Sequence, residues 1–174
     1  SLMADIEERV RTGGGSAGAR CGIEAIDRRL GGFLPGQFIF IGGRPGMGKS
    51  SLVLQMAKAA VQKRRASVLY FSLEMMGEEL VERLVSSETG IDSDFMRDKK
   101  LNSQNFVAIE SAVADISSWP LEIDDKTQNI EALRARAISY KFKYGLDLLV
   151  IDYVQRITTG KNYQNRDAEL GFVS

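Results

Sequence analysis

The sequence has no histidine among its 174 residues, so catalysis by histidine and metal binding through imidazole are excluded. Its single cysteine, Cys21, excludes an intramolecular disulfide and fits a reducing cytoplasm, which is the expected location. No apolar run approaches the ~20 residues that a membrane-spanning helix needs, so no membrane partner is expected. Basic and acidic residues number 23 each, which leaves no net charge to attract nucleic acid to the whole surface.

The composition predicts a globular domain of ordinary size, because 44% of the residues are apolar and 26% are charged. Residues 1–19 are expected to be a linker segment, with a short charged helix from Met3 to Thr12 and a flexible stretch from Gly13 to Gly18. Residues 20–174 are expected to form the folded domain.

A glycine-rich run, Gly43–Ser50 (GRPGMGKS), matches the phosphate-binding loop G-x-x-x-x-G-K-[ST] of P-loop NTPases. Glycines let the backbone turn tightly and approach a ligand, and the turn points N–H groups at phosphate oxygens. Lys49 would bring its charge to the phosphates, and the Ser50 hydroxyl could bind Mg²⁺. The residues expected to bind ATP or another NTP are Gly43, Arg44, Pro45, Gly46, Met47, Gly48, Lys49, Ser50 and Ser51.

The flanking residues favour this interpretation over a simple glycine turn. The apolar run Phe38–Ile41 predicts a buried strand before the loop. Residues Ser51 to Gln62 predict a helix after it, with Leu52, Met56 and Ala59 on the apolar face. Strand, loop and helix are the context that the motif requires, and the helix N-terminus adds partial positive charge.

The remaining chain alternates predicted strands and helices. The further strands expected are Val68–Phe71, Leu121–Asp124 and Leu148–Ile151, the last one fully buried. The first helix expected passes through Ile23, Ile26 and Leu30 and is stopped by Gly31-Gly32. A second is expected from Gly77 to Thr89, followed by a short piece that is capped by Asp92 or Ser93 and runs to Arg97. Two more are expected: one capped by Ser103, with a stripe of Phe106, Ile109, Val113 and Ile116, and one from Thr127 to Gly145.

This alternation predicts an α/β fold with a parallel sheet flanked by helices. In such sheets, ligands bind at the carboxyl ends of the strands. Gly43, Glu74 and Asp152 each follow the end of a predicted strand, so we expect them to meet at one edge of the sheet.

Two carboxylates are candidates for the chemistry at that edge. Asp152 follows four apolar residues, which is the Walker B pattern of a carboxylate that holds Mg²⁺, and the loop makes this interpretation preferable to a capping role. Glu74 could orient or deprotonate a water that attacks the γ-phosphate, or it could simply favour the start of the next helix. The spacing of Glu74 alone leaves both possibilities open.

Basic residues give no indication of a nucleic-acid surface. Arg134, Arg136, Lys141 and Lys143 are expected to form the solvated face of a helix. Lys161 and Arg166 are expected to lie in an unstructured end rather than in a loop that contacts nucleic acid, since no aromatic residues alternate with them as a stacking surface requires.

Three motifs together resemble the ATPase domain of DnaB-type replicative helicases. They are Arg44–Ser50, Ser72–Met75 and Ile151–Gln155, in the family's order. The segments Gly22–Asp27, Gly31-Gly32, Asn165-Arg166 and Glu169-Leu170 also resemble the family's pattern, so the resemblance covers about Arg20 to Ser174.

The resemblance implies a RecA-like ATPase domain that uses ATP or another NTP with Mg²⁺, from a bacterium or a phage. It implies that Lys49 and Ser50 bind phosphate and Mg²⁺, that Lys49 and Glu74 are catalytic with Glu74 as the base, and that Asp152 is the Walker B metal ligand. It also implies hexameric rings, translocation on single-stranded DNA, and contacts with primase and a helicase loader in the full-length protein.

The sequence departs from the family after Asp152. A glutamine motif that senses the γ-phosphate, DNA-contacting loops and an arginine finger are not found before Ser174, so the C-terminal strands are expected to be missing. A finger can be worth several orders of magnitude in rate, so the chain is expected to bind nucleotide, turn it over slowly and not unwind DNA. Cys21 stands where the family usually has a small hydroxyl residue.

An alternative function is a short RecA-like nucleotide-binding module that regulates or loads a partner without acting as a motor. A continuing reading frame beyond Ser174 would favour the helicase, whereas a stop codon would favour the module. A recombinase or clock-type ATPase is a weaker alternative, because the run Asp152–Gln155 is more typical of helicases.

Overall fold

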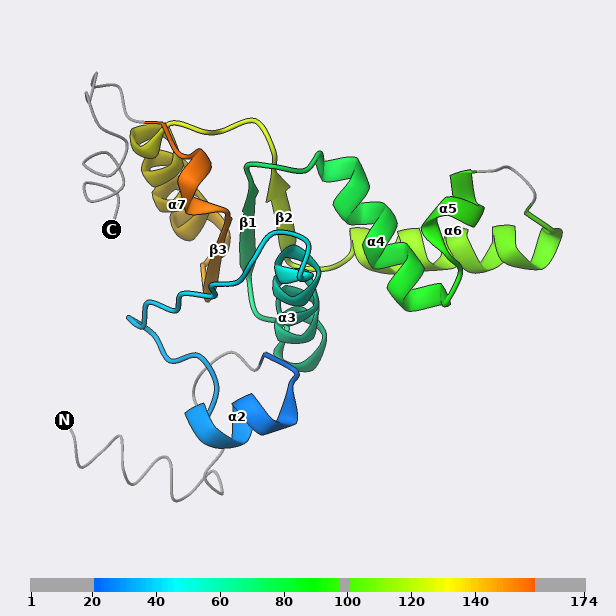
Figure 1. Ribbon diagram of the computed structural model, residues 1–174, viewed down its shortest axis with the longest axis horizontal. Coiled ribbons are helices and arrows are strands. Elements are labelled where there is room, and N and C mark those ends of the chain that lie inside the picture. The colour runs from blue at the N-terminus through cyan, green and yellow to red at the C-terminus, as the bar shows by residue number, and fades with distance from the viewer. Residues whose placement is uncertain (1–20, 98–100, 159–174) are drawn as a thin grey trace. The chain divides into compact units, whose positions relative to one another are not determined.

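The computed structural model describes residues 21–97 and 101–158, so the expected linker segment 1–19 lies outside the described residues. The chain forms two compact units, Ser1–Ala66 and Ser67–Ser174. The first unit contains α2 (Glu24–Leu30) and α3 (Lys49–Arg64), both labelled in Figure 1. The elements of the second unit are β1 (Val68–Ser72), α4 (Gly77–Thr89), α5 (Ser93–Arg97), α6 (Ser103–Ser117), β2 (Leu121–Asp124), α7 (Ile130–Tyr144), β3 (Leu148–Asp152) and the 3-10 helix η1 (Val154–Arg156).

In the first unit, the predicted end of α2 is confirmed. The helix ends at Gly31, whose φ of 70° places it in the left-handed region that glycine tolerates best. A turn follows at residues 34–37, in which the Gln37 N–H donates to the Leu34 carbonyl at 3.2 Å.

The strand predicted for Phe38–Ile41 is wrong. These residues form no strand, and the side chains of Phe38 and Phe40 are 81% and 65% exposed. Ile39 and Ile41 instead line a cavity of the first unit with neighbours that include Ile26, and this segment has no ladder partner among the described residues. An apolar run predicts only a tendency to form a strand, whereas a strand also requires a second backbone to bond with.

Helix α3 is longer than predicted and buries a different face. It runs Lys49–Arg64 rather than from Ser51 to Gln62, and Leu52 is 38% exposed although Met56 is buried as expected. Apolar residues occupy more than one side of this helix, so their spacing does not select one face. The buried side chains of α3 are Leu54, Met56, Ala57, Ala60 and Val61.

The second unit is built on a three-stranded parallel sheet with the order β2-β1-β3, so the predicted α/β architecture with parallel strands is confirmed. β1 is the central strand and all of its residues are buried. Its partners are in register, with Val68 beside Leu121 of β2 and beside Leu148 of β3. The strands lie side by side in Figure 1, with the long helix α7 next to them. Because the strands are parallel, their carboxyl ends share one edge.

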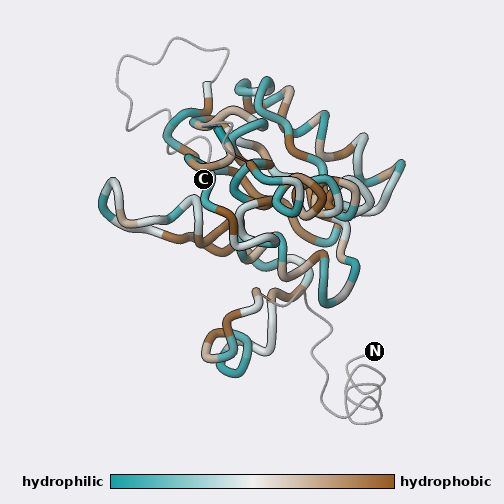
Figure 2. The backbone as a smooth tube through the Cα atoms, turned by 90° about the vertical axis from the view of Figure 1, so that its right-hand side faces the viewer, coloured by the Kyte–Doolittle hydropathy of each residue, from teal (hydrophilic) through white to brown (hydrophobic). Residues whose placement is uncertain are grey.

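The core of the second unit lies where α7 packs against β1. Leu69, Phe71, Leu133, Tyr140 and Ile157 are members of this cluster and are almost completely buried. The turns of the helices alternate between hydrophilic and hydrophobic residues in Figure 2, as packing along one side requires. Among the described residues, no helix combines the length and apolar character needed to cross a membrane.

The helices of the second unit agree with the predictions in place but differ in detail. α4 has the predicted bounds, and Asp92 caps α5 by accepting from the Asp94 N–H at 2.8 Å. α6 is capped by Asn102 rather than Ser103. α7 begins at Ile130 rather than Thr127, because Asn129 accepts from its first N–H groups.

Two predicted burial patterns are wrong. Phe106 and Val113 of the α6 stripe are 55% and 42% exposed, and Leu149 of β3 is 41% exposed. Spacing predicts which side chains share a face, but not whether a second element covers that face. The basic residues of α7 are exposed as expected, although Arg136 also forms ion pairs with Glu122 and Asp124.

The loop after β2 is held by Asp124. Its carboxylate accepts from the Thr127 N–H at 2.9 Å, the Thr127 hydroxyl at 2.8 Å and the Lys126 N–H at 3.0 Å. Burial acts to raise the pKa of Asp124, but these hydrogen bonds and the charge of Arg136 outweigh it, so the pKa is lowered. A carboxyl group with a lowered pKa in the folded state stabilises the fold above its unfolded pKa.

We therefore expect the free energy of unfolding to fall as the pH drops through the folded-state pKa of Asp124. Urea unfolding at a series of pH values from about 6 down to about 3 measures this loss. The Asp124→Asn variant should be less stable at neutral pH and should lose less stability on acidification. Asp115→Asn, on the exposed surface of α6, is the matched control. Equal acid sensitivity in Asp124→Asn and wild type would contradict this role.

Candidate functional site

The predicted phosphate loop forms a tight turn that leads directly into α3. Gly46 and Gly48 each have a φ of 77°, a conformation that side chains with a Cβ adopt only with strain. Gly48 is the N-cap residue of α3, and its carbonyl accepts from the Leu52 N–H at 2.9 Å. The first N–H groups of a helix have no acceptor within the helix, so this turn presents donors where an anion could bind.

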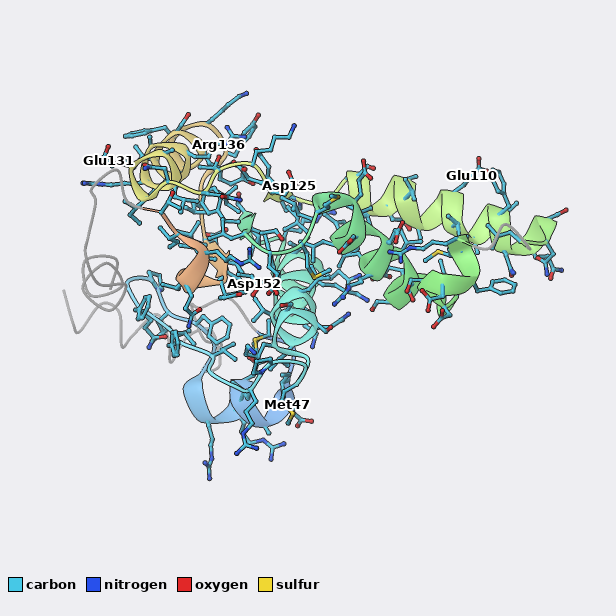
Figure 3. The ribbon with its side chains drawn as sticks, turned by 45° about the horizontal axis from the view of Figure 1, so that its top comes forward. Met47, Glu110, Asp125, Glu131, Arg136 and Asp152 are labelled. Carbon is cyan, nitrogen blue, oxygen red and sulfur yellow. The ribbon has the colours of Figure 1, made fainter. Side chains whose placement is uncertain are left out.

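Lys49 lies folded back over the loop. Its Nζ donates to the Arg44 carbonyl at 3.0 Å, and a Cβ on Gly43 would come within 3.4 Å of the Lys49 side chain. Met47 at the tip of the loop is 74% exposed (labelled in Figure 3). The predicted residues from Gly43 to Ser51 thus form one continuous loop and first helical turn in the first unit.

Asp27 organises the segment that precedes α2. Its carboxylate accepts from the Cys21 N–H at 2.8 Å and from the Gly22 N–H at 3.1 Å. Cys21 is 1% exposed, and burial raises the pKa of its thiol. A Cβ on Gly22 would lie 2.4 Å from that of Ala59 on α3, so only glycine fits there. The cysteine that departs from the family pattern is therefore an unreactive packing residue.

In the second unit, the structure brings Glu74 and Asp152 to the same edge of the sheet. Ser72 pairs with Asp152 across β1 and β3, and the Leu73 N–H donates to the Asp152 carbonyl at 2.7 Å. Glu74 follows one residue later. The predicted convergence is thus confirmed for these two residues, whereas Gly43 belongs to the other unit.

Asp152 is a buried carboxylate with a partner that its sequence pattern did not predict. Its side chain is 7% exposed, and Oδ2 accepts a hydrogen bond from the Tyr70 hydroxyl at 3.0 Å. Burial, with the charge of Asp152, raises the pKa of the Tyr70 phenol. Figure 3 labels Asp152 where β3 ends. The available signal was a tyrosine hydroxyl in the middle of a strand whose first four residues are otherwise apolar.

The short loop that carries Glu74 is anchored on both sides, while the Glu74 side chain itself is exposed. The Ser72 hydroxyl donates to the Met75 carbonyl at 2.6 Å, and the Gly77 N–H donates to Oδ2 of Asp125 at 2.7 Å. Asp125 (Figure 3) follows β2, so the ends of two strands hold this loop. Sequence reasoning missed Asp125, because a carboxylate that bonds a distant backbone group leaves no local pattern.

A family model described as the DnaB-like helicase C-terminal domain matches residues 18–174. The chain belongs to the DnaB-like helicase C-terminal domain family. Replicative DNA helicase DnaB of Leifsonia xyli is 33% identical over 95% of this chain and 36% of that protein. DnaB of Nostoc is 34% identical over 98% of this chain and 19% of that protein. The chain thus spans about a third or less of the length of these relatives.

Solved structures agree with this DnaB-like family membership. A structure of a DnaB-like replicative helicase and its interactions with primase has a TM-score of 0.89 and 26% identity, over 100% of this chain and 44% of that chain. A second solved structure, of an ATPase domain, has a TM-score of 0.88 at 24% identity, over 99% of this chain and 62% of that chain, which supports the fold. The RecA-like fold predicted from the sequence is confirmed.

The residues of this DnaB-like domain suit a magnesium ion chemically. Mg²⁺ prefers oxygen ligands, keeps several waters and is usually bound by one or two protein groups with phosphates. Asp152 offers Oδ1, which accepts no hydrogen bond from the described residues, and Ser50 offers a hydroxyl in the first turn of α3. Within residues 21–97 and 101–158, no cluster of three or more potential acidic, cysteine or histidine ligands occurs. Each unit thus offers one oxygen donor, which suits an ion whose other ligands are phosphates and waters rather than a closed protein cage.

The remaining residues that the sequence singled out near the end of the chain lie outside the described residues. They are Lys161, Asn165, Arg166, Glu169 and Leu170.

Proposed function

We propose that this chain is the ATP-binding and ATP-hydrolysing part of a replicative DNA helicase. The observation that carries the proposal is the glycine turn at the N-terminus of α3, in a chain that belongs to the DnaB-like family over residues 18–174. Family membership favours the helicase over a free-standing regulatory module.

In this proposal, the backbone of residues 43–51 binds the phosphates, and Lys49 exchanges its bond to the Arg44 carbonyl for the β- and γ-phosphates. Ser50 and Asp152 hold Mg²⁺, which neutralises charge on the phosphates when it is bound. Glu74, on its anchored loop, orients or deprotonates the attacking water. The first turn of α3 adds the partial positive charge of a helix N-terminus.

For the whole protein, we propose a hexameric ring that translocates on single-stranded DNA in the cytoplasm, with primase and a helicase loader as partners. The names of the relatives, and the similar structure that includes interactions with primase, support this proposal.

The test is ATP binding and turnover by this chain with Mg²⁺, with and without single-stranded DNA. We expect Glu74→Gln to lower turnover by about 100-fold and to leave the Kd for ATP within about twofold, because the carboxylate acts on water rather than on phosphate. Glu78→Gln, in the exposed first turn of α4, is the matched control. Unchanged turnover in Glu74→Gln would remove the assignment of the base, and a wild-type chain that does not bind ATP would overturn the proposed function.

A further inference from the structure

Tyr70 is the polar side chain in the middle of the central strand. It is fully buried on β1, and its backbone pairs with Val150 of β3. Asp152 lies two residues beyond Val150, so the side chains of Val150 and Asp152 lie on the same face of β3. Tyr70 pairs with Val150, so its side chain lies on that face of the sheet too. The Tyr70 ring can therefore reach diagonally along the sheet, and its hydroxyl lies 3.0 Å from Oδ2 of Asp152.

The direction of this hydrogen bond is determined by chemistry. An ionised carboxylate can only accept, whereas a phenol is protonated at neutral pH and can donate. The Tyr70 hydroxyl therefore occupies Oδ2 and restricts rotation of the carboxylate. Oδ1 is left without a donor among the described residues, which makes it the oxygen available to a metal ion.

We propose that Tyr70 is a positioning residue for the Mg²⁺ ion of bound ATP, because its hydroxyl holds Oδ2 of the Asp152 carboxylate and leaves Oδ1 for the metal. This inference rests on the proposed function. Groups that hydrogen-bond a metal ligand fix its orientation, and their removal typically costs tenfold or more in metal affinity. Tyr70 itself does not touch the ion or the nucleotide.

Tyr140 provides a matched control, because it is also a buried tyrosine of the second unit. Its hydroxyl accepts from Ser67 Oγ at 3.3 Å and donates to the Val68 carbonyl at 3.4 Å. A phenylalanine at either position removes a buried hydroxyl and keeps the ring, so both variants lose stability for the same reason. Only Tyr70→Phe removes a bond to Asp152.

The experiment measures the Kd for ATP in EDTA and across a Mg²⁺ titration, with the 174-residue chain. For Tyr70→Phe, we expect the Mg²⁺ concentration at which the gain in ATP affinity is half-maximal to rise about tenfold. The Kd for ATP in EDTA should be unchanged. Tyr140→Phe should match the wild type in both measurements. In Asp152→Asn, Mg²⁺ should no longer lower the Kd for ATP. Adding Tyr70→Phe to this variant should not change the Kd further, since the two residues act through one carboxylate.

Each result decides the proposal. A Mg²⁺ titration of Tyr70→Phe that superposes on that of Tyr140→Phe overturns the role of Tyr70, while loss of tightening in Asp152→Asn leaves the proposed function intact. A wild-type chain whose ATP affinity does not respond to Mg²⁺ overturns the proposed function and this inference together. If Tyr70→Phe does not fold, Tyr70→Met fills a similar volume without a hydroxyl. Failure of both to fold would show that the hydroxyl supports the fold rather than the metal.

Discussion

The Lys49→Ala variant is expected to bind ATP about 100-fold more weakly than the wild-type chain, because charge-assisted bonds to phosphate contribute about 3 kcal/mol. The folded state should lose little, since the bond that Lys49 makes here is an exposed one to the Arg44 carbonyl. Equilibrium titration with ATP and Mg²⁺ measures the affinity, and thermal unfolding checks that the variant remains folded.

Lys63→Ala is the matched control for this prediction. It removes the same charge from an exposed position near the other end of α3, so a general electrostatic effect would appear in both variants. We expect the affinity of Lys63→Ala to stay within about twofold of the wild type. An unchanged Kd for ATP in Lys49→Ala would remove the phosphate-loop assignment itself.

Local signals account for the parts of the fold that the sequence predicted well. β1 is a short apolar run covered on both faces, and α4 lies between an extended residue and Gly90, whose φ is 70°. Glycine after a helical pattern is a strong stop signal because it tolerates the left-handed region. Such elements are specified by a few neighbouring residues, so the sequence alone was sufficient to place them.

The failures occur where an element depends on distant partners. Residues 38–41 are as apolar as β1, but they have no ladder partner among the described residues and form no strand. Phe106 has the spacing of a core residue on α6 and is nevertheless 55% exposed. Periodicity predicts a face, whereas burial also requires another element to cover it.

The same distinction between local signals and distant partners applies to the candidate site. Lys49 begins α3, Asp152 ends β3 and Glu74 lies two residues after β1, so a glycine turn or a strand end marked each of them in the sequence. Tyr70 and Asp125 were missed, although each hydrogen-bonds a residue or loop of the site. Their partners are 82 and 48 positions away in the sequence, so only the folded sheet brings them together.

The core substitution Phe71→Ala is expected to destabilise the second unit by about 3–5 kcal/mol. Phe71 is fully buried on β1, within the cluster that includes Leu133 and Tyr140 of α7. Removing its ring loses the transfer free energy of the buried atoms and leaves a cavity that the surrounding sheet can only partly fill. Denaturant unfolding with a constant m-value measures this loss.

Phe142→Ala tests whether burial is the cause. It is the same chemical change on α7, but Phe142 is 88% exposed, so its effect on stability should lie within about 0.5 kcal/mol. Phe71 pairs with Ile151, so its ring lies on the face of the sheet opposite to the Asp152 side chain, and the cavity forms on the side covered by α7. A loss of stability as small as that of Phe142→Ala would show that the cluster around β1 is not the core of this unit.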